Sequence, residues 1–429
     1  MAEPTSRSLR SGGIVAIAAG IASTLLAVAV VRLLIWARTG FEFTDESMHI
    51  LSADARADAS FHNAFGSYTG LLFDLVGGDI VWFRRLGIVI LATAGLALGD
   101  RVVVFVARPE PPVPLRVLGA TIGSTGALHY YLFHLTPSYN WLNITGTVIA
   151  LAGVLHLLGP TPRRPWVGGT AAALGTLVAF MGKFSAPAAV AVVTLILLAV
   201  AVEGPWRERL QRLTPVIAPF AVLIVAHHAL VESWPTTIER IRDGSNRLLV
   251  LDPDYTLSEQ VASIREAVVD VVTEGSLLLL PVVAAVAFHE ISRRRSAGMP
   301  VPVRALATAA VTVTSIIVVV DDRWAGGVYG YQTLSWVGVT LVLTAALMLI
   351  TTRTWNPQAV AVAIAGTAAA SAYAVGSNNG FLVQLNGGTG FLFCAALALL
   401  LALPRSERSL PVATFAVISA VAVQVVITP

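Results

Sequence analysis

Residues 13–36 read GIVAIAAGIASTLLAVAVVRLLIW, an apolar run that follows Arg7 and Arg10. A helix needs about 20 mostly apolar residues to cross the roughly 30 Å hydrocarbon core of a bilayer, so this run is long enough to span it. No small-residue cleavage pattern follows Trp36. We therefore expect an uncleaved first membrane span with the basic N-terminus in the cytoplasm.

The composition extends this interpretation to the whole chain. Its 429 residues are 56% hydrophobic and only 12% charged, with a mean hydropathy of +0.76, whereas soluble domains carry about 25% charged residues. This excludes an ordinary soluble protein. The net charge of +3 does not support a nucleic-acid partner, and the single cysteine, Cys394, excludes a disulfide framework or a thiolate metal site. Lys183 is the one lysine among 28 basic residues, and this arginine bias fits a GC-rich bacterial genome.

Twelve further apolar runs follow the first one. The candidate spans cover approximately residues 13–36, 86–107, 116–134, 140–158, 167–182, 185–202, 214–231, 275–292, 303–320, 333–352, 357–375, 389–403 and 410–428. We predict an all-α, polytopic integral membrane protein with about 13 membrane helices in one membrane domain, residues 1–429. Residues 167–202 could form two spans or one kinked helix, because Gly182, Lys183 and Pro187 are compatible with either a turn or a kink. The predicted number of spans therefore ranges from about 11 to 13.

Arginine placement sets the expected orientation. With the N-terminus inside, each inner loop carries arginine, for example Arg163 with Arg164, as the positive-inside rule requires. The outer side then receives two long segments, 37–85 and 232–274, and most of the acidic residues. We expect a multi-pass protein of the bacterial plasma membrane.

The first outer segment opens with FEFTDESMHI, residues 41–50, and so places Asp45 and Glu46 at the membrane surface. Partial desolvation makes a carboxylate a stronger base, which suits general base catalysis. Met48, Ile50, Leu51 and Ala55 recur at roughly helical spacing, which predicts an amphipathic helix along the interface. The alternative is that Thr44 or Asp45 caps this helix and both acids favour its N-terminal dipole. Both interpretations can hold together.

These features resemble the GT-C superfamily of polytopic glycosyltransferases, which use polyprenyl-phosphate sugars. The resemblance rests on one N-terminal span, an outer segment opening with Asp45 and Glu46, a surface helix, further spans, and the later segment PSYNWL at 137–142. The superfamily includes protein O-mannosyltransferases and bacterial lipid A aminoarabinose transferases. The chain departs from the larger members because it has no sizeable C-terminal soluble domain, so the acceptor, whether lipid, glycan or protein, stays open.

The resemblance implies an inverting transfer, in which Asp45 is the catalytic base and Glu46 orients the acceptor or a divalent cation. The leaving lipid phosphate needs positive charge or hydrogen-bond donors at the outer surface. The candidates for that role are Lys183, Arg240, Arg242 and His228. Each assignment has a structural alternative. Lys183 could extend to the membrane surface without binding substrate, and the two arginines could belong to a solvated charged helix.

Further polar and aromatic residues on the outer side are candidates for binding substrate. They are His49, His62, Tyr139, Asn140, Asp321, Asp322, Arg323, Trp324 and Tyr329. Aromatic faces stack on sugars, while acids and amides bind hydroxyl groups. An interfacial aromatic belt is the alternative for the cluster at 321–332. His129 and His134 are five residues apart, too widely spaced for a paired helical metal site, so we predict no metal there.

Two other function classes remain open from the sequence. A transporter or flippase for a lipid-linked sugar would share the hydrophobicity and the outer acids, but it predicts polar residues near the membrane midplane, where these spans are mostly apolar. An oligosaccharide ligase or polymerase would also use a long outer loop, with arginine and histidine in place of an early acidic pair.

Overall fold

The computed structural model describes residues 6–40, 45–55, 64–107, 110–132, 135–159, 164–251, 333–374 and 384–426, together with isolated residues between 258 and 287. All regular structure in these ranges is helical. The helices are α1 (Ser6–Trp36), α2 (Asp45–Ala55), α3 (Phe65–Leu75), α4 (Ile80–Val106), α5 (Val113–Leu128), η1 (His129–Leu132), α6 (Tyr139–Leu158), α7 (Pro165–Gly182), α8 (Ala186–Ala201), α9 (Trp206–Gln211), α10 (Thr214–Leu230), α11 (Trp234–Leu251), α15 (Thr333–Thr352), α16 (Pro357–Ala374), η3 (Asn386–Gly388), α18 (Thr389–Leu401) and α19 (Arg405–Val426).

The all-helical prediction is confirmed for the described part of the chain. Eleven of the thirteen predicted spans coincide with helices, and the other two, 275–292 and 303–320, lie outside the described residues. Four helices, α1, α4, α6 and α7, are long and apolar enough to cross a membrane, and α10 with α11 would make a fifth if this bent pair is one span. The count of about 13 therefore stays a prediction.

The ambiguity at residues 167–202 resolves into two helices. Helix α7 ends at Gly182, and α8 begins at Ala186. Lys183 follows α7 with an extended backbone, and its N–H donates to the carbonyl of Ala179 at 2.8 Å. Pro187 lies in the first turn of α8, where its missing N–H costs no helical hydrogen bond.

Glycines spaced seven residues apart set the packing of α6 against α7. A Cβ on Gly175 would overlap the backbone nitrogen of Ala150, and one on Gly168 would touch the carbonyl of Gly153 at 3.0 Å. A Cβ on Gly182 would overlap the carbonyl of Tyr139. Because apolar side chains gain little from leaving lipid, membrane helices associate through such close backbone approach. The antiparallel register therefore fixes the end of α7 beside the start of α6.

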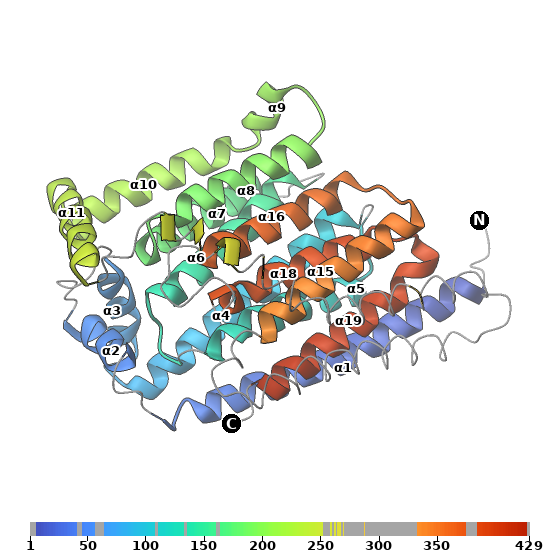
Figure 1. Cartoon of the computed structure of the whole chain (residues 1–429), viewed down its shortest axis with the longest axis horizontal. Helices are drawn as coiled ribbons and strands as arrows, with labels where there is room; N and C mark the ends of the chain where they lie inside the picture. The colour runs from blue at the N-terminus through green and yellow to red at the C-terminus, as the bar shows by residue number, and fades with distance from the viewer. Residues whose placement is uncertain are drawn as a thin grey trace.

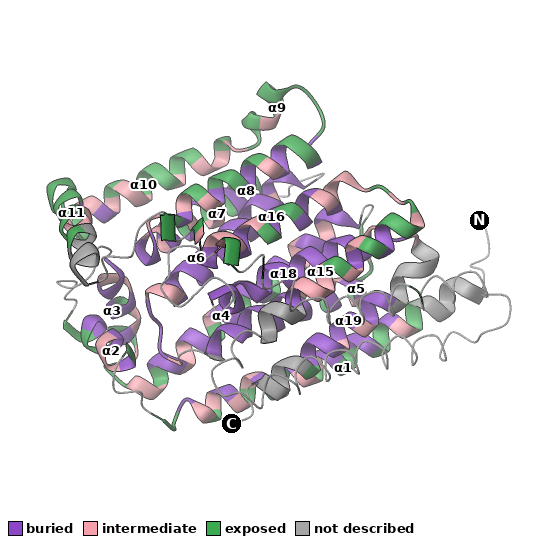
Figure 2. Ribbon diagram, viewed as in Figure 1, coloured by how far each residue is buried: buried purple, intermediate pink, exposed green. Residues whose placement is uncertain are grey.

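The same principle joins α4 to α5. Gly95 and Gly99 on α4 lie against Gly119 and Gly123 on α5 so closely that no side chain fits between them. The spacing of four residues on each helix is the small-residue pattern of tight membrane helix pairs. These two pairs form much of the buried centre of the molecule, while α10 and α11 are largely exposed (Figure 2).

We expect Gly175→Ala to lower the thermal unfolding midpoint in detergent, because the new methyl group overlaps the backbone of α6. Overpacking of this kind costs typically about 1–3 kcal/mol. Gly20→Ala is the matched control, since a Cβ there has no heavy atom within 4 Å, and its midpoint should stay unchanged. Equal melting of both variants would contradict the close α6–α7 contact.

The helices divide the molecule into two ends (Figure 1). Helices α2, α3 and α11 gather at one end, named here the α2 end, while α1 begins at the opposite end. Lys183, which follows α7, and Tyr139, which begins α6, also belong to the α2 end through the contact between Gly182 and Tyr139. Several residues predicted to act on substrate are thus brought to one place.

Candidate functional site

Helix α2 carries the acidic pair in its first turn, where the helix dipole favours negative charge. This position fits the capping interpretation of Asp45 and Glu46. The two side chains differ in environment, since Asp45 is exposed and Glu46 is only 4% exposed. Of the two carboxylates, Asp45 is the one that an external substrate can reach.

The face of α2 that packs on the protein carries polar as well as apolar residues. Glu46, His49, Ile50 and Ala53 are buried at helical spacing, whereas Leu51 is exposed. The predicted helix is therefore confirmed, while its placement along a membrane interface stays a prediction. Polar partners inside the bundle hold Glu46 on the buried face.

Those partners are Arg84 on α4 and Thr136. The Nε and Nη2 atoms of Arg84 donate to the two oxygens of Glu46 at 2.8 and 2.6 Å, and the Thr136 hydroxyl also donates to this carboxylate. Arg84 is itself buried and donates to the carbonyls of Ala37 at 3.1 Å and Gly40 at 2.9 Å. Such a bidentate pair is strong and geometrically specific. It ties α2, the end of α1 and α4 together directly below Asp45.

His49, one turn after Asp45, lies in an aromatic cluster. Its ring meets Phe65 edge-on at 5.7 Å and Tyr139 at 5.6 Å between ring centroids, and the rings of Phe65 and Tyr139 are 5.9 Å apart. These rings come from α2, α3 and α6. Edge-to-face pairs at this distance stabilise one another beyond their area burial. The predicted residues His49 and Tyr139 are therefore adjacent, and both lie beside the acidic helix.

The turn before α6 supports Tyr139. Ser138 caps α6 by accepting from the N–H of Trp141 at 3.2 Å, and its hydroxyl bonds that of Tyr130 at 2.7 Å. The predicted residue Asn140 follows, and its Oδ1 atom is buried with no hydrogen-bond partner among the described residues. A buried amide oxygen without a partner is costly, so Asn140 is suited to accept a hydrogen bond from a bound molecule.

Lys183 is a buried cation near the start of α6. It is 9% exposed, its Nζ lies 5.2 Å from the centroid of the Tyr373 ring, and it donates to the Tyr373 carbonyl at 3.5 Å. It makes no ion pair with any carboxylate in the part of the chain that the structure describes. Burial lowers the pKa of Lys183 to about 8, because desolvation disfavours the ammonium form.

Tyr139 connects the lysine to the acidic helix. Its carbonyl lies against Gly182, the residue before Lys183, and its ring meets His49. An exposed carboxylate, a cluster of aromatic rings, and a buried ammonium that pairs with no carboxylate among the described residues are therefore carried by segments that contact one another. This arrangement suits binding of an anionic, hydroxyl-bearing molecule beside a base.

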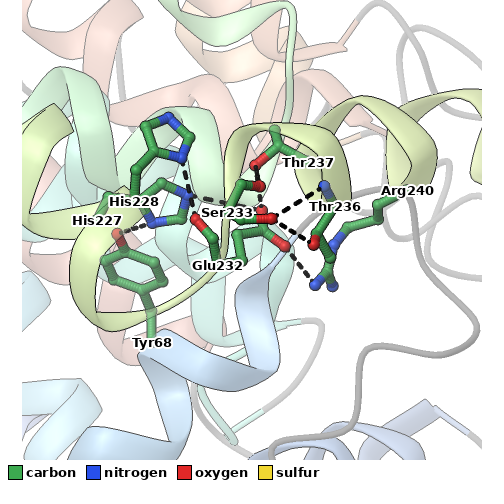
Figure 3. A network of polar contacts seen from close by, with 8 residues as sticks. All are labelled: Tyr68, His227, His228, Glu232, Ser233, Thr236, Thr237 and Arg240. Atoms are coloured by element: carbon green, nitrogen blue, oxygen red, sulfur yellow. Dashed lines mark hydrogen bonds and ion pairs between the residues drawn. The ribbon is translucent and has the colours of Figure 1, made fainter.

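Two other predicted residues, His228 and Arg240, belong to a polar network at the bend between α10 and α11 (Figure 3). The Oε2 atom of Glu232 pairs with Arg240 at 2.5 Å, and the Nδ1 atom of His228 lies 3.0 Å from the Glu232 carbonyl, with its ring stacked on Trp234. The imidazole of His227 bonds the Tyr68 hydroxyl at 2.9 Å and faces Oε1 of Glu232 at 3.5 Å. Arg240 and His228 thus have partners within the chain, which weakens their case as phosphate ligands.

The remaining predictions have three outcomes. Arg242 is exposed on α11. His62, Asp321, Asp322, Arg323, Trp324 and Tyr329 lie outside the described residues. The described residues contain no group of three His, Cys, Asp or Glu side chains that could hold a metal ion, and both oxygens of Glu46 are occupied by Arg84 and Thr136. A divalent cation beside Asp45 stays a prediction.

Three residues of the site were not predicted, namely Arg84, Thr136 and Tyr373. One signal in the sequence could have indicated Arg84. It lies next to an apolar run on the expected outer side, where the positive-inside rule predicts few arginines. No comparable sequence signal indicated Thr136 or Tyr373. In comparisons with known proteins, no family model, no curated protein and no solved structure matches this chain.

Proposed function

We propose that this protein is a membrane glycosyltransferase of GT-C type, which transfers a sugar from a polyprenyl-phosphate donor to an acceptor hydroxyl. The observation that carries the proposal is that Tyr139 contacts both His49, on the helix that carries the exposed Asp45, and Gly182, the residue before Lys183. The buried Lys183 ammonium has no carboxylate partner among the described residues. A sugar phosphate ester needs both groups, a base for the acceptor and a positive charge for the leaving phosphate.

In this proposal Asp45 takes the proton of the acceptor hydroxyl as its oxygen attacks the anomeric carbon. The new bond from the acceptor oxygen to the anomeric carbon forms as the bond from that carbon to the phosphate oxygen breaks. The lipid phosphate leaves with the bonding electrons, and the Lys183 ammonium balances its growing charge. Attack opposite the leaving group inverts the anomeric configuration.

Glu46 has a positioning role in this scheme. Because Arg84 and Thr136 occupy its oxygens, it fixes the first turn of α2 and so the position of Asp45. His49, Tyr139 and Asn140 lie beside that turn and are the proposed sugar and acceptor contacts. In the proposed orientation, which follows from the positive-inside rule applied to the N-terminal arginines, the α2 end lies on the outer side of a bacterial plasma membrane.

The direct test is transfer by the purified protein in nanodiscs. Radiolabelled sugars on a panel of polyprenyl phosphates are offered together with a bacterial membrane extract as acceptor, and labelled product and donor binding are measured separately. Transfer from one donor would support the proposal. Donor binding without transfer would instead favour a carrier of lipid-linked sugar.

The Lys183 pKa of about 8 predicts a pH dependence of donor use. Below pH 8 the ammonium is charged and attracts phosphate, whereas above it the amine is neutral, so the KM for donor should rise as pH rises through 8. Bound phosphate stabilises the charged form, which moves this transition to higher pH in the complex. The measurement is KM for donor from pH 6.5 to 9.5.

Lys183→Arg and Lys183→Met are the matched variants for this profile. A guanidinium stays charged at every pH tested, so the arginine variant should lose the rise in KM above pH 8. The methionine variant should have a high KM throughout. An unchanged profile in Lys183→Met would remove this residue from the donor site.

A further inference from the structure

Helix α11 turns away from α10 at 83°. Since α10 runs alongside α7 in the bundle (Figure 1), α11 runs across the α2 end and not along the bundle. A helix perpendicular to membrane spans at their end lies parallel to the bilayer plane. Its depth relative to the headgroups depends on which of its faces is apolar.

Three faces of α11 are chemically distinct, given the roughly 100° rotation per residue of a helix. Trp234 and Ile238 lie on one face and are 58% and 62% exposed. On the opposite face lie Thr236, Glu239 and Asp243, which are exposed polar or acidic residues. Apolar and acidic residues are thus separated across the helix, as in helices that lie in a membrane interface.

The third face is attached to the protein. Thr237 donates to Glu232 Oε1 at 2.9 Å, and Arg240 pairs with Glu232 Oε2 at 2.5 Å (Figure 3). These contacts fix the rotation of α11 about its own axis. Trp234 and Ile238 therefore cannot turn inward to become buried. Among the described residues Ile238 stays mostly exposed, and Trp234 stays mostly exposed although one side of its ring stacks on His228.

The apolar face continues the exposed surface of α10. Val222, Val225 and Leu230 on α10 and Val231 in the connection are all exposed, and they lead along the chain to Trp234 and Ile238. Side chains like these on a span-length apolar segment face lipid. Arg242 lies at the border of the apolar face of α11, where its guanidinium can reach lipid phosphates.

We propose that α11 is an interfacial helix bound to the lipid surface at the α2 end, with Trp234 and Ile238 inserted at the boundary between headgroups and acyl chains. The inference goes beyond sugar transfer and does not depend on it, because it needs only that the chain crosses a membrane. The depth expected for such a face is about 5–10 Å into the headgroup and acyl boundary.

Site-specific fluorescence tests this placement, because the native Cys394 is buried and an introduced cysteine can be labelled selectively. Ile238→Cys and Glu239→Cys, adjacent exposed positions on different faces, are labelled with an environment-sensitive fluorophore. They are then placed in nanodiscs of phosphatidylcholine and phosphatidylglycerol with or without brominated acyl chains. We expect a blue shift and loss of most emission with brominated lipid at 238, and neither at 239.

Trp234→Cys is a second variant on the apolar face and should behave like Ile238→Cys, which keeps the test valid if one variant folds poorly. Wild-type protein treated with the fluorophore gives the background from Cys394. Water-like emission without quenching at both 234 and 238 would overturn the proposal. Equal quenching at 238 and 239 would also overturn it, because the helix would then be submerged without a defined face. Sugar transfer is not part of the readout, so its failure leaves this result unaffected.

Discussion

Asp45→Asn is expected to lower the rate of sugar transfer by about 10²–10⁴, the usual contribution of a general base, while donor binding persists. The amide of asparagine occupies the same space but cannot accept the acceptor proton. Asparagine also caps helices as well as aspartate does, so α2 should remain folded. The measurement is kcat for transfer alongside donor affinity, on protein whose thermal unfolding midpoint equals that of wild type.

Asp54→Asn is the matched control for this variant. Asp54 is an exposed aspartate near the other end of α2, so it tests loss of one negative charge from the same helix. Its transfer rate should stay at the wild-type level. If Asp45→Asn keeps full transfer, Asp45 acts only at the helix terminus, and an oligosaccharide ligase or polymerase based on arginine and histidine becomes the better interpretation.

The positions of the apolar helices were the most predictable part of the fold. Lipid imposes one rule on every span, a long apolar run with its backbone hydrogen bonds satisfied internally, and this rule is visible in the sequence from residue 13 to residue 428. Even the break after Gly182 was visible as a small residue, a cation and a nearby proline. The seven-residue spacing of Gly168, Gly175 and Gly182 also indicates, from the sequence, which face of α7 packs closely on α6.

The predicted site residues gathered only in part, because partners distant in sequence decide which face of a helix is buried. Glu46 meets Arg84 38 residues later, and Tyr68 meets His227 159 residues later. No local periodicity encodes either pairing. For the same reason, hydropathy could not show that α2 buries the carboxylate of Glu46 against Arg84.

Arg84→Met is expected to destabilise the protein by about 3–5 kcal/mol, the cost of leaving one member of a buried ion pair uncompensated. Glu46 would lose two of its donors, and the carbonyls of Ala37 and Gly40 would lose theirs. Glu46→Gln should be destabilising for the converse reason, because the guanidinium keeps its charge. The measurement is resistance to thermal and dodecyl sulfate unfolding.

The double variant, Arg84→Met with Glu46→Met, separates stability from positioning. Removing both charges eliminates the buried uncompensated charge, so its unfolding midpoint should recover much of the loss seen in Arg84→Met. Transfer should not recover with it, because α2 would no longer be fixed and kcat depends on where Asp45 lies. Arg84→Lys keeps the charge but not the bidentate geometry, so it should retain more stability than activity. Recovery of both stability and kcat in the double variant would show that the pair stabilises the fold without positioning Asp45.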